Sequence, residues 1–159
     1  MRRIGQAIFL WGIVCLFGYG VYQWYLLEPS FPQPLILWIP LTVLGIVGML
    51  RVPGWKHNKV VRVWFVVSVG GMLYHFAFAN QWLPALIPNP WAYWALLMAI
   101  GFAATGKLLR STYWYAVSAL NLLFFLGSNF LLLGLLGDYQ SVLLGIVSGI
   151  PLLYEGLRE

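Results

Sequence analysis

The chain alternates long apolar runs with short polar breaks, and this alternation predicts membrane-spanning helices. A helix needs about 20 apolar residues to cross the hydrocarbon core of a bilayer. Six runs approach this length, and we expect helices over residues 4–27, 35–50, 60–80, 91–109, 113–136 and 139–154. The pattern therefore predicts an all-α, polytopic transmembrane bundle of six helices within one domain, residues 1–159.

The last run has two structural interpretations. We expect it to be the shortest helix, and Pro151 near its end can kink a helix because proline lacks a backbone N–H. A five-helix bundle with this segment lying in the interface is the structural alternative. A further hypothesis is a repeat of three helical hairpins, because two runs begin alike, at Pro32-x-Pro34 and Pro88-x-Pro90. Internal repeats are common in transporters, but apolar helices that start at proline also arise independently.

The composition fits a lipid environment. Hydrophobic residues make up 62% of the chain and charged residues 8%, whereas about a quarter of the residues in an average globular domain are charged. A water-soluble fold with this composition would expose large apolar patches and aggregate. We therefore expect an integral membrane protein.

The basic residues orient the chain. All nine lysines and arginines fall at the N-terminus, in the 51–62 and 107–112 loops, or at the C-terminus. With six crossings these segments share one side, and the opposite side holds Glu28 and Asp138. Cytoplasmic loops are enriched in lysine and arginine, so we expect both termini in the cytoplasm of a prokaryote, with the helices in its inner membrane. The net charge of +5 thus indicates orientation rather than nucleic-acid binding.

A few polar residues interrupt the spans and form the candidate site. His75 lies well inside the third span, and an ionisable residue in a span is a functional-site hypothesis by default. Asn129 and Ser128 fall at a similar depth in the fifth span, and Asn121 lies nearer its middle. We expect His75 to be a buried, hydrogen-bonded histidine that fixes helix packing. The alternative is a polar intramembrane pocket around these four residues, for a solute or a proton.

Small residues recur at four-residue spacing in two spans, where they permit close helix packing in lipid. The two stripes are Ser141, Gly145 and Gly149 in the sixth span, and Ala95, Ala99 and Ala103 in the fourth. Each stripe predicts a packing face, either inside the bundle or toward another copy of the chain or another membrane subunit.

The 51–62 loop is the most basic segment. Its cations are Arg51, Lys56, Lys59 and Arg62. Beside an anionic leaflet each base adds attraction, so we expect contact with anionic membrane lipids. The alternative is that these charges serve topology alone.

The sequence lacks recognisable catalytic chemistry. No HExxH, GxSxG or phosphate-binding glycine motif is present, no carboxylate lies in the middle of a span, and Cys15 is the sole cysteine. We expect no metal and no cofactor, since haem held by two histidines would need a second histidine within a span. The expected function is therefore a non-enzymatic accessory or scaffold subunit of a membrane complex, or a homo-oligomer. The alternative is a small-solute or lipid transporter or channel with a pocket around His75 and Asn129.

Overall fold

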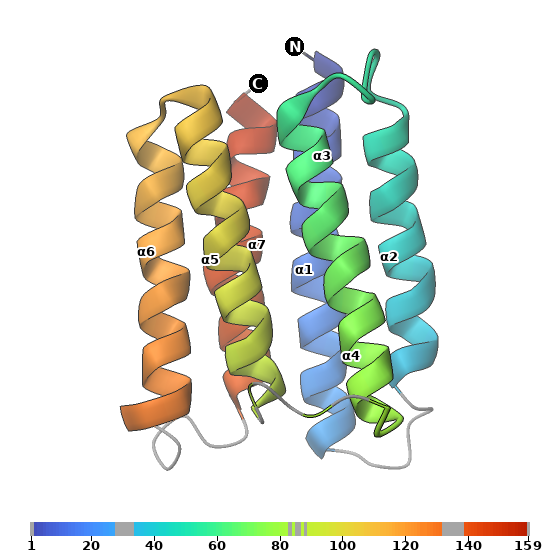
Figure 1. Cartoon of the computed structure of the whole chain (residues 1–159), viewed down its shortest axis with the longest axis vertical. Helices are drawn as coiled ribbons and strands as arrows, with labels where there is room; N and C mark the ends of the chain where they lie inside the picture. Colours follow the sequence, from blue (N-terminus) through green and yellow to red (C-terminus); the bar gives the residue numbers. More distant parts are fainter. Residues whose placement is uncertain are drawn as a thin grey trace. The chain divides into compact units, whose positions relative to one another are not determined.

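The structure, a computed structural model, describes residues 2–27, 34–82, 84, 87, 89–131 and 139–158. All regular secondary structure in these residues is helical, and the predicted six-helix bundle is confirmed (Figure 1). Four of the helices are long and apolar enough to cross a membrane on their own, namely Ile4–Trp24, Lys59–Phe78, Pro90–Leu109 and Gln140–Arg158. Helices suit a bilayer because they satisfy every backbone polar group within one segment.

The chain divides into two compact units. Unit 1 comprises Met1–Trp55 and Gly134–Glu159, and unit 2 comprises Lys56–Leu133. Unit 1 therefore joins the beginning of the sequence to its end, and unit 2 is a continuous segment.

Unit 1 contains three helices: α1 (Arg2–Leu27), α2 (Pro34–Leu50) and α7 (Gln140–Arg158). Helix α1 packs against both of the others and runs antiparallel to α7 (Figure 1). Glycines set the spacing of α1 and α7. A Cβ atom added at Gly12 would lie 2.8 Å from the backbone nitrogen of Leu153, and one at Gly149 would lie 3.1 Å from the carbonyl oxygen of Gly12. Real Cβ atoms rarely come this close to backbone atoms, so the two helices touch backbone to backbone.

Aromatic rings fill the contact between α1 and α2. The Trp11 ring of α1 covers Gly45 of α2, and the Trp38 ring of α2 covers Gly18 of α1. Trp38 also meets Tyr19 edge-on, with ring centroids 5.0 Å apart. Each large ring thus occupies the space that a glycine on the facing helix leaves open.

Helix α7 differs from its prediction in length. It continues through Pro151, beyond the predicted end at Tyr154, to Arg158. With 19 residues it is longer than the 17-residue α2, so the expectation that it would be the shortest helix was wrong. Nineteen residues extend about 28 Å, close to the roughly 30 Å of the hydrocarbon core. The shortness that motivated the five-helix alternative is therefore absent.

Unit 2 contains the remaining helices. One continuous helical stretch consists of α3 (Lys59–Phe65), the π-helical turn η1 (Val66–Gly70) and α4 (Gly71–Ala79). It is followed by α5 (Pro90–Leu109), α6 (Thr112–Leu126) and a second π-helical turn, η2 (Gly127–Leu131). The predicted residues 132–136 of the fifth span lie outside the described residues.

Local sequence explains where two of these helices begin. The side chain of Asn58 accepts hydrogen bonds from the backbone N–H groups of Val60 and Val61, and Asn89 does the same for Trp91 and Ala92. Asparagine is a favoured N-cap because its side-chain oxygen pairs N–H groups that have no partner within the helix. Pro90 then takes the first helical position, which does not need an N–H.

The packing of unit 2 centres on α5. Trp64 of α3 meets Phe102 of α5 edge-on at 4.9 Å, and its indole N–H donates to Thr105 Oγ1 at 3.0 Å. The same Phe102 ring stacks on Trp114 of α6, with centroids 5.5 Å apart. Ser118 of α6 also donates to a carbonyl oxygen of α5 at 2.7 Å. Aromatic contacts and two partly buried hydrogen bonds thus hold α5 between α3 and α6.

Candidate functional site

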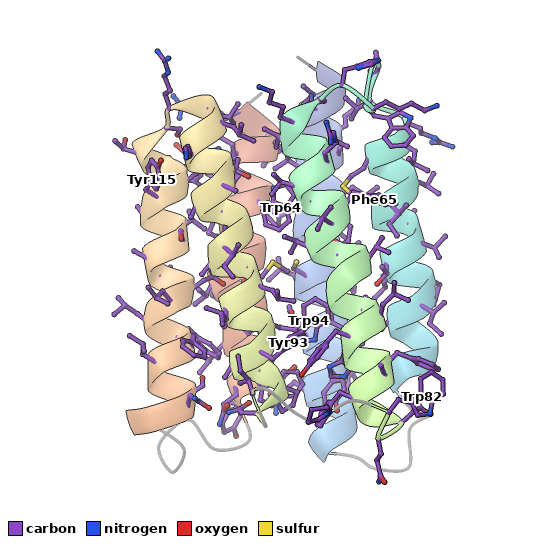
Figure 2. All side chains as sticks on the ribbon, in the orientation of Figure 1. Trp64, Phe65, Trp82, Tyr93, Trp94 and Tyr115 are labelled. Atoms are coloured by element: carbon purple, nitrogen blue, oxygen red, sulfur yellow. The ribbon has the colours of Figure 1, made fainter. Side chains whose placement is uncertain are left out.

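An aromatic cluster surrounds His75 in unit 2. We define it as Tyr74, His75 and Phe78 of α4 together with Tyr93 and Trp94 of α5. The His75 ring lies 6.1 Å from Trp94, 6.3 Å from Tyr93 and 6.4 Å from Phe78, measured between centroids. Figure 2 shows Tyr93 and Trp94 directed from α5 toward α4. His75 is therefore one ring in an aromatic layer between two helices.

Two tyrosine hydroxyls anchor this cluster to the backbone. Tyr93 donates to the carbonyl oxygen of Gly71 at 3.2 Å, and Tyr74 donates to that of Pro84 at 2.8 Å. Gly71 is buried beneath Trp94 and Leu97. These two side chains occupy the space that a Cβ atom at position 71 would need. The absence of a side chain at Gly71 therefore lets α5 side chains lie against the helix just before His75.

The other polar residues predicted for the pocket lie in α6 and η2. The Asn89 side chain donates to the backbone carbonyl of Ser128 at 3.2 Å, which links the start of α5 to η2. Among the described residues, Ser128 Oγ is buried without a hydrogen-bond partner. Asn121 is buried and donates to the carbonyl of Val117 in its own helix at 3.0 Å. Asn129 is half-buried.

The described hydrogen bonds do not join His75 to Ser128 or Asn129. His75 lies among rings of α4 and α5, and Ser128 is held through its backbone by the cap of α5. The structure thus brings Ser128 together with Asn89, a residue that the sequence did not single out, and leaves His75 in an aromatic setting.

The small-residue stripe of α7 lies against α1. Ser141 is fully buried and donates to the carbonyl oxygen of Tyr19 at 2.7 Å. A Cβ atom at Gly145 would lie 3.0 Å from the Cβ of Tyr19, and Gly149 faces Gly12 as described above. All three residues of this stripe therefore contact the same helix within unit 1.

The stripe of α5 is less uniform. Ala95 and Ala99 are buried, and Ala103 is half-buried. The carbonyl of Ala99 accepts the bond from Ser118, so this part of the stripe lies against α6.

The basic residues of the 51–62 segment are on the surface. Arg51, Lys56, Lys59 and Arg62 are all exposed, and the segment turns through Gly54, whose φ is +67°. Another exposed base, Arg158, lies 3.9 Å from Glu155 within α7.

Three features escaped the sequence reasoning. Gln23 is buried in α1, and its Oε1 accepts from the backbone N–H of Val142 at 3.4 Å. A glutamine inside an apolar run indicates a buried hydrogen bond, so this contact could have been predicted from the sequence. For the Trp64–Thr105 bond, the only signal in the sequence was that each residue places a polar group within an apolar span. The π-helical turns have no sequence signal that we recognise.

Several of the described polar side chains link neighbouring helices, as in the Trp64–Thr105 and Ser141–Tyr19 hydrogen bonds. Among the described residues, no three histidine, cysteine or acidic side chains are close enough to hold a metal ion. The helices are apolar and long enough to cross a bilayer. Fold and site together define a polytopic integral membrane protein.

Comparison with known proteins identifies a relative of this chain. The chain is similar to NADH-ubiquinone oxidoreductase chain 6 of Latimeria chalumnae, with 28% identity over 126 residues that cover 79% of this chain and 68% of the relative. No protein-family model matches the chain. No solved structure matches it either.

Proposed function

We propose that this protein is a non-catalytic membrane subunit of a multi-subunit NADH–quinone oxidoreductase complex. The observation that carries the proposal is the similarity to a protein named as one chain of such an oxidoreductase, which extends over 79% of the sequence. The use of the described polar side chains for helix packing supports it, because a structural subunit needs a stable bundle and no reaction centre. We place the protein in a prokaryotic inner membrane with both termini in the cytoplasm, in keeping with the distribution of its basic residues.

The helical stretch from Lys59 to Ala79 is the surface that we assign to a neighbouring subunit. It is the least buried of the four candidate spans. Leu73 and Val66 are 66% and 69% exposed, and a Cβ atom at Gly70 would meet no other atom within 4 Å. Small residues on an open face let a second helix approach closely in lipid. The π-helical turn that contains Gly70 is of a kind that often occurs at functional sites.

The test begins with the native membrane. An affinity-tagged chain, solubilised in a mild detergent, is expected to co-migrate with other membrane subunits and with NADH–quinone reductase activity on a native gel. Deletion of the gene is expected to lower that activity in membranes. Recovery of the chain alone, together with unchanged NADH oxidation in the deletion strain, would contradict the proposal.

A matched pair of variants then tests the surface. Gly70→Leu adds bulk where the isolated chain has room, so we expect normal folding but loss of co-migration. Gly20→Leu is the control, because a Cβ at Gly20 of α1 also meets nothing within 4 Å. If Gly70→Leu assembles as well as Gly20→Leu does, the Lys59–Ala79 face is not the subunit contact.

A further inference from the structure

Unit 2 has a one-sided charge distribution. Its sequence, Lys56–Leu133, contains five lysines and arginines (Lys56, Lys59, Arg62, Lys107 and Arg110) and no aspartate or glutamate. All five are exposed. The four acidic residues of the protein belong to unit 1, so no carboxylate within unit 2 neutralises these cations.

The helix packing brings the five cations to one end of the unit. Trp64, two residues after Arg62, donates to Thr105, two residues before Lys107. Farther along the same helices, Gly71 lies against Trp94 and Leu97, which establishes that the α3–α4 stretch and α5 run antiparallel. The beginning of α3 and the turn between α5 and α6 therefore lie at the same end of the unit (Figure 1). We call these five side chains the basic end of unit 2.

Arg110 has an uncommon backbone conformation. It ends α5 with φ 52° and ψ 41°, in the left-handed region, and its backbone N–H bonds to the carbonyl of Gly106. Glycine is the usual residue at such a helix end because it has no Cβ to clash. An orientation signal requires only a positive charge somewhere in the loop, and it does not require arginine at this left-handed position. The place of Arg110 therefore motivates a search for a role of its guanidinium group beyond topology.

Aromatic residues mark the height of the basic end in the membrane. Tyr115 follows Arg110 by little more than one helical turn and is 47% exposed, near the same end of α6 (Figure 2). Tyrosine and tryptophan side chains favour the headgroup level, where the ring is in apolar surroundings and the polar edge is in water. This preference of Tyr115 predicts that the cations lie at the level of the lipid phosphates.

We propose that the basic end of unit 2 binds the headgroups of anionic phospholipids, with Lys59, Arg62 and Arg110 as its principal ligands. Arginine pairs with two phosphate oxygens at once, and lysine adds a point charge. This inference does not depend on the proposed assembly, because the isolated protein carries the whole site. It extends the lipid contact expected for the 51–62 loop to the turn between α5 and α6.

The experiment measures lipid retained by the purified protein. The protein is incubated in a mild detergent with phosphatidylglycerol or phosphatidylcholine of the same acyl chains, and bound lipid is counted by native mass spectrometry. We expect a preference for phosphatidylglycerol that falls about fivefold for each base removed in the series Arg110→Gln, Arg62→Gln/Arg110→Gln and Lys59→Gln/Arg62→Gln/Arg110→Gln. Arg158→Gln is the control, because it removes an exposed base from unit 1 and should leave the preference unchanged.

Arg110→Gly separates loss of binding from loss of folding. Glycine relieves the left-handed strain, so this variant should be at least as stable as the wild-type protein and yet retain less phosphatidylglycerol. Equal retention of both lipids by the wild-type protein would overturn the proposal. An equal loss in Arg158→Gln and Arg110→Gln would also overturn it, as would full retention in the triple variant, and the charges would then be assigned to topology or to an acidic partner protein.

Discussion

The glycine contact between α1 and α7 leads to a quantitative prediction. Replacing Gly12 by alanine places a Cβ atom 2.8 Å from the backbone nitrogen of Leu153 and from its Cγ and Cδ2 atoms. Side-chain rotation cannot relieve the contact with the nitrogen, so the helices must separate by several tenths of an ångström. Such overpacking typically costs about 1–3 kcal/mol.

The intrinsic preference of alanine for helices acts in the opposite direction. Alanine is favoured over glycine in a helix interior by about 1 kcal/mol. At Gly20 of the same helix, where a Cβ meets nothing within 4 Å, only this gain applies. We therefore expect Gly20→Ala to be more stable than Gly12→Ala by about 1–3 kcal/mol, the overpacking term alone.

Reversible unfolding in mixed micelles with increasing SDS, followed by circular dichroism, gives both free energies. Adding Leu153→Ala to Gly12→Ala should restore only part of the loss, because the clash with the backbone nitrogen remains. If Gly12→Ala proves as stable as Gly20→Ala, the backbones of α1 and α7 are not in contact, and the packing described for unit 1 is wrong.

Three further substitutions test other contacts by the same unfolding assay. Thr105→Val leaves the indole N–H of Trp64 unpaired and should lower stability by about 1–3 kcal/mol, and a Trp64→Phe/Thr105→Val double variant should recover part of this loss. Ser141→Ala removes the bond to the Tyr19 carbonyl and should cost about 0.6 kcal/mol, an average value for hydrogen bonds between helices in membranes; a change above about 2 kcal/mol would indicate a larger role. His75→Phe retains an aromatic ring in the cluster and should leave stability and assembly almost unchanged, whereas loss of assembly or of a transport phenotype would show that the imidazole itself is needed.

The sequence predicted the helices well because hydrophobic length is a strong local signal. The starts of all six helices were expected within two residues of those observed. The end of α7 was placed too early because the apolar run stops at Tyr154, before Glu155 and Arg158. Within a bundle, neighbouring packing tolerates one missing backbone hydrogen bond, and the helix passes Pro151 as α2 passes Pro40.

The candidate site was harder to predict because it depends on which helix faces meet. Similar depth suggested that His75, Ser128 and Asn129 would share a pocket, but depth does not specify rotation about the helix axis. The π-helical turns add to this difficulty, since an extra residue in a turn rotates all that follows relative to an ideal helix. The small-residue stripe of α7 was easier to identify, because regular spacing along one helix defines a face without knowledge of its partner. The pocket, the hairpin repeat and the orientation of the chain stay predictions.

The composition of unit 1 has a consequence for biosynthesis. The bond between Ser141 and Tyr19 joins residues 122 positions apart, so α1 enters the membrane long before α7 has been translated. Until then the face of α1 that contains Gly12 has no α7 to cover it, although every helix of unit 2 has already been synthesised. A nascent chain that stalls before residue 140 would therefore present an uncovered α1 to the quality-control proteases of the membrane.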